Sequence, residues 1–243
     1  MSGNLGIIGA HGRLGRRVAE AATAAGWRLT LSATSADWIE SDTPDVVIDA
    51  SNRSCVERVA AYCAGSGAAL LEAISGLGAD ERRLLAEASE RVPVLVAANL
   101  SQGHYLQTLA LAAALRPVAG GREWSVLVSD RHPTTKRDRP SATCLELARR
   151  CEEEGAVNVE LSSRREGPPV SEHSIQLGGA GESVTITHSV TDLIASATGA
   201  LAAASWLKDA APGIWTMRDV WEADRHPGRA ATEMTLTSGK PHQ

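Results

Sequence analysis

A short stretch of the chain, residues 130–143, combines side chains suited to proton transfer beside a bound anion. It holds a histidine, His132, a lysine, Lys136, and a serine, Ser141, that stands just before an apolar helical pattern. Ser141 is a natural N-cap, and a helix starting there directs unpaired N–H groups at whatever lies in front. Such groups attract carboxylates and phosphates. The stretch therefore predicts a proton donor next to a carboxylate site.

A solvated, charge-rich loop is the alternative for the same stretch, because runs of Arg, Asp, Thr and Pro usually form surface loops. Composition alone favours that alternative. The rest of the chain shifts the balance toward a site, because it supplies the motif of a cofactor domain.

A glycine turn near the start of the chain predicts a dinucleotide site. Residues 5–8 form a short apolar run, and three glycines follow at positions 9, 12 and 15. A helical pattern then continues through Val18 and Ala25. In this strand, turn and helix order, a pyrophosphate can rest on the helix N-terminus. An ordinary strand-to-helix turn is the alternative, but the context that the motif requires is present.

Further short apolar runs alternate with helical patterns in the first hundred residues. The runs are 45–50, 69–71 and 92–97, and the helical stretches are 53–66 and 79–90. This alternation predicts a parallel, doubly wound sheet.

The end of the second expected strand, 27–31, bears on which nucleotide is bound. An acid about 20 residues beyond the glycines normally holds the ribose 2′-hydroxyl, but none precedes Asp37 here. Thr34, Ser35 and Arg13 offer hydroxyl and guanidinium donors to a 2′-phosphate instead. We expect NADPH to be preferred, with NADH possible.

Composition indicates a globular enzyme. The chain has 243 residues, 43% of them hydrophobic, and a net charge of −5. We expect no nucleic-acid partner, because that needs a basic face, and no membrane segment. Four scattered cysteines and no signal peptide predict free thiols and a cytoplasmic location. No Cys-x-x-Cys occurs, so we expect no metal site.

The motifs together resemble the dihydrodipicolinate reductase family over nearly the whole chain. The family's Gly-Ala-x-Gly-Arg-Met-Gly is similar to residues 9–15, its Asp-Phe-Thr to 49–51, and its Ala-Pro-Asn-Phe-Ser-x-Gly to 97–103. Its catalytic signature, Glu-x-His-His-x-x-Lys-x-Asp-Ala-Pro-Ser-Gly-Thr, is similar to residues 130–143 with unbroken spacing. The order of the motifs is the same in both.

The resemblance implies an α/β fold: a Rossmann-type doubly wound parallel sheet with an inserted α+β domain of mixed sheet. Residues 1–103 and 194–243 would bind the dinucleotide, and 104–193 would bind substrate and mediate oligomerisation, as a homotetramer or homodimer. His132 and Lys136 would supply the proton to a carboxylate-bearing cyclic imine that NAD(P)H reduces. The remaining implied residues are Ser141, Ala142 and Thr143 for substrate, and Gly9, Ala10, His11, Gly12, Arg13, Leu14, Thr34, Ser35, Ser51, Ala73, Ser75, Ala98 and Asn99 for cofactor.

Departures from the family pattern favour a changed substrate pocket. The second histidine of the signature is Pro133, the glycine of Ser-Gly-Thr is Ala142, and the Gly-Thr-Thr-Gly loop reads Ala-Ile-Ser-Gly at 73–76. A late Ser-Arg pair is replaced by Asp-Leu at 192–193. We therefore expect a divergent imine reductase. The alternatives are an authentic 4-hydroxy-tetrahydrodipicolinate reductase of lysine biosynthesis and a non-catalytic NADP-binding scaffold.

Two later histidines, His173 and His188, also match the family's second half. We interpret both as residues on the face of a sheet in β-hairpins.

Overall fold

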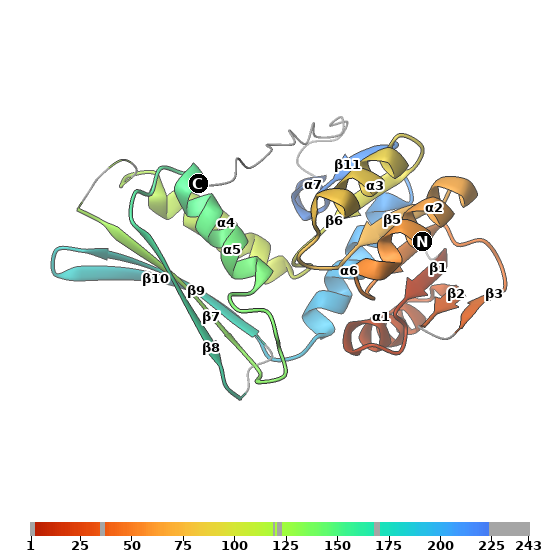
Figure 1. Ribbon diagram of the computed structural model, residues 1–243, viewed down its shortest axis with the longest axis horizontal. Coiled ribbons are helices and arrows are strands. Elements are labelled where there is room, and N and C mark those ends of the chain that lie inside the picture. Colours follow the sequence, from red (N-terminus) through yellow and green to blue (C-terminus); the bar gives the residue numbers. More distant parts are fainter. Residues whose placement is uncertain (1–2, 35–36, 119, 121–122, 168–170, 224–243) are drawn as a thin grey trace.

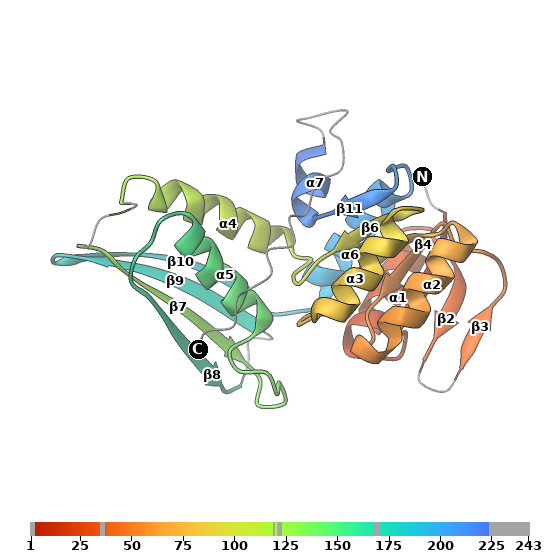
Figure 2. The same cartoon turned by 45° about the horizontal axis from the view of Figure 1, so that its top comes forward.

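Two β-sheets, each with its own helices, make up the protein and lie side by side (Figures 1 and 2). The computed structural model describes residues 3–34, 37–118, 120, 123–167 and 171–223. The expected cofactor residue Ser35 and the C-terminal stretch 224–243 lie outside the described residues.

The first sheet has seven strands in the order β11-β6-β5-β4-β1-β2-β3. Neighbouring strands run parallel, except that β3 runs antiparallel to β2. The expected second strand begins and ends slightly later than predicted, and the edge strand β3 was not expected. The strands are β1 (Asn4–Ile8), β2 (Arg28–Ala33), β3 (Trp38–Glu40), β4 (Val46–Asp49), β5 (Ala69–Glu72), β6 (Pro93–Val96) and β11 (Gly213–Trp215).

Helices cover both faces of this sheet. On one face α1 (Arg13–Ala24) and α6 (Ile194–Leu207) pack on Ile7, Ile48 and Leu71. On the other, α2 (Val56–Ser66) and α3 (Ala79–Ser89) pack on Val47, Leu70 and Val94. A short 3-10 turn, η1 (Arg53–Cys55), precedes α2, and α7 (Met217–Glu222) follows β11. The doubly wound parallel sheet is confirmed.

The second sheet has four strands in the order β10-β9-β7-β8. β7 pairs parallel with β8 and antiparallel with β9, so the sheet is mixed, as expected. Its elements are α4 (Gln102–Leu115), β7 (Ser125–His132), α5 (Ala142–Glu153), β8 (Val159–Arg165), β9 (Ser171–Gly179) and β10 (Glu182–Val190).

One face of the second sheet is covered and the other is open. Leu115 of α4 and Leu147 of α5 pack on Val128 and Ile175. Figures 1 and 2 show both helices on the same side of the strands. The other face carries Glu160, Gln176 and Thr185, which are exposed. A sheet with one solvated face is typical of mixed and antiparallel pairing.

The strand order of the first sheet reverses beside β1, which pairs with β2 on one side and β4 on the other. Ligands of open α/β sheets bind outside the carboxyl ends of the strands at such a point. The loops after β1, β2, β4, β5 and β6 all lie at that edge because these strands are parallel.

A substitution at Gly199 tests how closely α6 packs on the backbone of Leu100. A Cβ there would lie 1.8 Å from the Leu100 carbonyl oxygen, which is backbone and cannot move cheaply. We predict that Gly199→Ala lowers the free energy of unfolding in urea by about 1–3 kcal/mol. Gly65→Ala is the matched control, because nothing lies within 4 Å of its added methyl. It should raise stability by about 0.5–1 kcal/mol. Equal effects of the two substitutions would contradict the close helix-to-loop contact.

Candidate functional site

The turn after β1 has the shape that close approach of a pyrophosphate needs. Gly9 has a φ of 77°, and a Cβ there would lie 2.8 Å from the Ala50 carbonyl oxygen. A Cβ on Gly15 would lie 2.2 Å from the Gly9 carbonyl oxygen. Side chains at either position would fill the cradle, so the turn fits a dinucleotide.

The helix after the turn offers free donors to an anion. α1 begins at Arg13, and its N-cap Gly12 provides no side-chain cap. Within the described part of the chain, the N–H groups of Arg13 and Leu14 have no acceptor. Unpaired N–H groups and the helix dipole favour a phosphate at this position.

The other expected cofactor residues follow the strand ends at the same edge. Thr34 follows β2, and its hydroxyl accepts from the Asp37 N–H over 3.2 Å. Ser51 follows β4 and donates its N–H to an Asp49 carboxyl oxygen over 2.9 Å. Asn99 follows β6, and its side-chain oxygen accepts from the Ser101 N–H at 3.0 Å. Ala73 and Ser75 follow β5, Ala98 follows β6, and Ala10 and His11 belong to the turn itself.

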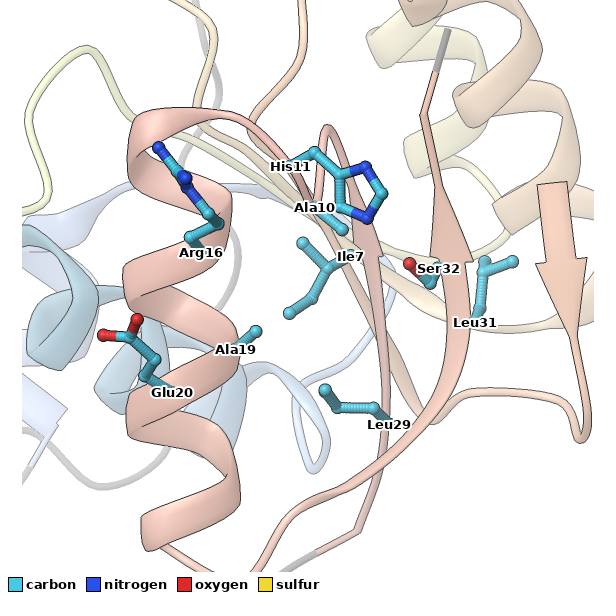
Figure 3. Close-up of a pocket in the computed structure, with 9 residues that line it drawn as sticks. All are labelled: Ile7, Ala10, His11, Arg16, Ala19, Glu20, Leu29, Leu31 and Ser32. Carbon is cyan, nitrogen blue, oxygen red and sulfur yellow. The ribbon is translucent and has the colours of Figure 1, made fainter. Parts of the chain in front are cut away.

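A cavity of about 320 Å³ lies between α1 and β2, next to the glycine turn (Figure 3). Of the expected cofactor residues that the structure describes, only Ala10 and His11 lie on its wall. The rest of the wall extends back along the helix and strands, away from the strand ends, so we do not assign the dinucleotide to it. The lining residues are Ile7, Ala10, His11, Arg16, Ala19, Glu20, Leu29, Leu31 and Ser32.

His132, the expected proton donor, is the last residue of β7 and is 7% exposed. Its ring centroid lies 5.2 Å from that of His173, in an edge-on arrangement. Its buried Nε2 has no hydrogen-bond partner among the described residues. Burial lowers the pKa of His132, and the nearby Lys136 ammonium lowers it further. The imidazole is therefore mostly neutral at neutral pH.

Lys136 lies in the turn after β7, where its N–H donates to the Pro133 carbonyl oxygen over 3.0 Å. Its half-buried ammonium pairs with the Asp138 carboxylate at 2.9 Å. Lys136 is thus near enough to His132 to affect its pKa, as the spacing predicts, but a protein carboxylate already neutralises its charge.

The helix start at Ser141 forms as predicted. The Ser141 hydroxyl accepts from the Cys144 N–H at 3.2 Å, which makes Ser141 the N-cap of α5. Ser141 is buried, and its own N–H donates to Asp130 over 2.6 Å. The N–H groups of Ala142 and Thr143 remain without an acceptor among the described residues. They are the donors left for a substrate carboxylate.

Asp130 is a buried anion behind this helix start. It accepts from the Ser141 N–H, the Ser163 hydroxyl and Arg165, whose Nη1 lies 2.8 Å away. Burial alone would raise the pKa of Asp130, but these donors lower it well below its usual range. Sequence reasoning gave no role to this carboxylate, which fixes the start of α5.

His173 and His188 are sheet residues, as interpreted, and they also belong to the site. They stand opposite each other on β9 and β10. The Ser141 hydroxyl and the His173 Nε2 are 3.2 Å apart, and burial lowers the pKa of His173 to about 3. His188 Nε2 lies 3.2 Å from the Ser101 hydroxyl. A third ring, His104 of α4, lies 6.2 Å from His188 and was missed. No sequence signal marks His104, because its ring meets His188 only where α4 packs on β10.

The two sheets meet at the end that carries His132. In the strand register, Arg131 stands opposite Glu172, and Ser171 stands opposite Val190, the last residue of β10. The chain then enters α6 after residues 191–193. Asp192 in this connection pairs with Arg17 of α1 at 3.0 Å. The imidazole therefore lies at the end of the second sheet that faces the helix of the glycine turn.

Metal-binding geometry is absent from the described part of the chain, where no three His, Cys, Asp or Glu side chains are grouped to hold an ion. Among the same residues, no helix has the length and apolar character to cross a bilayer. The cysteines Cys55, Cys63, Cys144 and Cys151 are free, and the last three are buried.

Solved structures with a similar fold come from several reductases and dehydrogenases. A dipicolinate-bound dihydrodipicolinate reductase from a Paenisporosarcina species matches with a TM-score of 0.66 and 16% identity, over 89% of this chain and 98% of the other. An amine dehydrogenase from Mycobacterium smegmatis matches with a TM-score of 0.59 and 13% identity, over 89% of this chain and 95% of the other. At these identities the likeness concerns the fold alone.

Sequence comparison gives the family. The family model for the dihydrodipicolinate reductase N-terminus matches residues 3–100, and the model for its C-terminus matches residues 106–221. A 4-hydroxy-tetrahydrodipicolinate reductase from Stenotrophomonas maltophilia is 34% identical over 72% of each chain. One from Halorhodospira halophila is 31% identical over 90% of this chain and 99% of its own length. The protein therefore belongs to the dihydrodipicolinate reductase family of NAD(P)H-dependent oxidoreductases.

Proposed function

We propose that the protein uses NADPH to reduce a carboxylate-bearing cyclic imine, in a pocket altered from that of 4-hydroxy-tetrahydrodipicolinate reductases. One observation carries the proposal. The buried imidazole of His132 and the open N–H groups of α5 share the end of the second sheet that faces α1. When bound, NADPH supplies a hydride.

Each residue of the substrate side has a role in this proposal. The N–H groups of Ala142 and Thr143, with the Ser141 cap, bind a substrate carboxylate at the start of α5. His132 gives a proton to the substrate, and Lys136 offsets the negative charge that develops on the imine nitrogen and its conjugated carbon. A bound carboxylate raises the fraction of His132 that is protonated, because it opposes the effect of Lys136.

Three departures support an altered pocket. Pro133 follows His132 directly and has neither a ring nitrogen nor an N–H. Ala142 adds a methyl at the first residue of α5. Asp192, one of the two residues that replace the family's Ser-Arg pair, bonds Arg17 and the Ile194 N–H instead of presenting a cation. Each lost partner costs roughly 1.5–3 kcal/mol of binding to a dianion.

An authentic 4-hydroxy-tetrahydrodipicolinate reductase of lysine biosynthesis is the second candidate. The curated relatives favour it, since one of that name aligns over 90% of this chain. A non-catalytic NADP-binding scaffold is a third candidate. NADPH binding without turnover of any cyclic imine would support the scaffold, whereas turnover of 4-hydroxy-tetrahydrodipicolinate above all other imines would support the authentic enzyme.

The division of the chain and its assembly also belong to the proposal. We propose residues 1–103 and 194–243 as the dinucleotide domain and 104–193 as the substrate domain. The two chain crossings between the sheets, at 97–101 and 191–193, support this division. We propose a homotetramer or homodimer formed through the open face of the second sheet, where Glu160, Gln176 and Thr185 are exposed. The free cysteines are consistent with a cytoplasmic location.

Arg13 tests the nucleotide preference. It is exposed at the first position of α1, and the glycine turn before it bonds the Ala33 carbonyl oxygen at the end of β2, directly before Thr34. We expect Arg13→Ala to weaken NADPH binding by about tenfold or more and NADH binding much less, because a guanidinium–phosphate hydrogen bond contributes about 1.5–3 kcal/mol. Fluorescence titration with both nucleotides measures this. Arg16→Ala, three positions further along α1, is the control and should change neither affinity. An equal loss for both nucleotides would place Arg13 away from the 2′-phosphate.

His132→Gln tests the proton donor. We expect kcat to fall by about 10²-fold or more with an unchanged Kd for NADPH, as for loss of a general acid. Because its pKa is lowered, His132 becomes protonated only as pH falls below its ordinary value. The wild-type rate should therefore rise toward acidic pH, and the variant should lack this rise. An intact rate in the variant would remove His132 from the chemistry.

Pro133→His tests the altered pocket. The new imidazole would stand beside His132 and offer a donor to a second carboxylate. We predict that kcat/KM for 4-hydroxy-tetrahydrodipicolinate rises about tenfold, equivalent to about 1.4 kcal/mol, while kcat/KM for a monocarboxylate cyclic imine does not. Pro133→Ala is the control, since it removes the ring without adding a donor. No gain over that control would show that Ala142 and the 192–193 connection set the substrate.

A further inference from the structure

Two buried carboxyl side chains lie next to each other at the carboxyl ends of β4 and β5, directly before the loops proposed to bind the cofactor. Asp49 is the last residue of β4 and Glu72 is the last residue of β5, and the strand register pairs them. Both are 0% exposed. Asp49 lies two residues after Val47 and Glu72 two residues after Leu70, and residues two apart on a strand share a face. Because Val47 and Leu70 face α2 and α3, both carboxyls lie on that face of the sheet.

Each carboxyl uses one oxygen to hold the loop that follows its own strand. Asp49 Oδ1 accepts from the N–H and the hydroxyl of Ser51. Glu72 Oε1 accepts from the Ile74 N–H at 2.9 Å. The other two oxygens, Asp49 Oδ2 and Glu72 Oε2, are buried without a partner among the described residues. A proton on either of them would provide the missing hydrogen bond between the side chains.

Among the described residues, none of the groups that shift the pKa values of Asp49 and Glu72 is a cation. α2 contributes the buried thiol of Cys63, whose pKa is raised by burial and by the charges of Asp49 and Glu72. α3 contributes Leu85 and Ala88, which do not titrate. Burial, and then the charge of Asp49, raise the pKa of Glu72 to about 9, and burial also raises the pKa of Asp49. Two charged carboxylates at this place would repel each other, and no described cation offsets their charge.

We propose that Asp49 and Glu72 share one proton and act as a positioning pair that holds the loops after β4 and β5 in place for the cofactor. The shared hydrogen bond ties the Ser51 loop to the Ile74 loop across two strands. The inference rests on the proposed function only in placing NADPH at this edge. Neither residue takes part in the chemical step.

Glu72→Gln is the sharp test, because an amide has the shape of the protonated acid and donates to Asp49 Oδ2 at every pH. An acid whose pKa is raised on folding binds a proton in the folded protein that the unfolded chain has lost. Wild-type stability therefore falls as pH rises from the ordinary pKa of glutamic acid toward the raised value. The variant lacks this fall. We expect its Tm to exceed the wild-type Tm by about 3 °C or more at about pH 8, with little difference at about pH 5.

Cofactor binding provides the second readout. Above about pH 9 the pair loses its proton, and the hydrogen bond that joins the two loops is lost with it. The wild-type Kd for NADPH should therefore rise about tenfold between roughly pH 8 and pH 10. In Glu72→Gln the Kd should stay level over that range. Glu90→Gln, an exposed site on the same side of the sheet, is the matched control and should follow the wild type in both measurements.

Asp49→Asn is the second variant, and it should also keep a level Kd at alkaline pH. A Glu72→Gln protein with the wild-type pH dependence of Tm would overturn the shared proton. Wild-type pH dependence of NADPH binding in both variants would overturn the link to the cofactor loops. Failure of the wild type to bind NADPH at any pH would instead refute the proposed function, so the two failures are distinct.

Discussion

The arrangement depends on how the chain passes between its two sheets. The second crossing leads from β10 into α6, and Asp192 within it bonds Arg17 on the helix of the glycine turn. β9 runs antiparallel to both β7 and β10, so β7 and β10 point the same way. The C-terminal end of β7 therefore lies at the same end of the sheet as this crossing. His132 therefore lies at the end of the second sheet that faces α1, and its place there is set by the backbone ladder of the strands rather than by its own loop.

Charge in the site is controlled by burial and by donors, and the outcome differs from group to group. Asp130 stays ionised although it is buried, because Ser141, Ser163 and Arg165 donate to it. His173 stays neutral because it is buried, and among the described residues its hydrogen-bond partner is the uncharged Ser141 hydroxyl. The helix start of α5 therefore has a fixed anion behind it and neutral rings beside it. Its two open N–H groups are the remaining donors for an incoming carboxylate.

Sequence reasoning predicted what local pattern determines. The glycine turn, the helix cap at Ser141 and the alternation of strands and helices depend on neighbours in the sequence, and the fold agrees with each of them. Contacts that depend on strand pairing were not predicted, because they join residues far apart in the sequence. His173 matched the family's second half, but only the register of β7 and β9 shows that it stands beside His132.

The buried partners of the candidate site were missed for a related reason. Asp49 was noted only as part of a motif, and Glu72 ends an apolar run without any sign that the two are adjacent. Parallel pairing of β4 with β5 creates that pair. Residue type and spacing can thus identify groups that meet a ligand, because these occupy loops and caps. They do not identify groups that meet each other across strands.

The two halves of the site differ in how freely their residues can change. On the cofactor side, a methyl group at Gly9 or Gly15 would meet backbone atoms, so the fold itself constrains the turn. On the substrate side, Pro133 is half-buried in a loop, and the Ala142 methyl lies on the first turn of a helix. Neither residue is part of a β-strand. If the proposed function holds, substitutions there would alter the pocket without disturbing either sheet, so a chain of this family could retain its fold while its substrate changes.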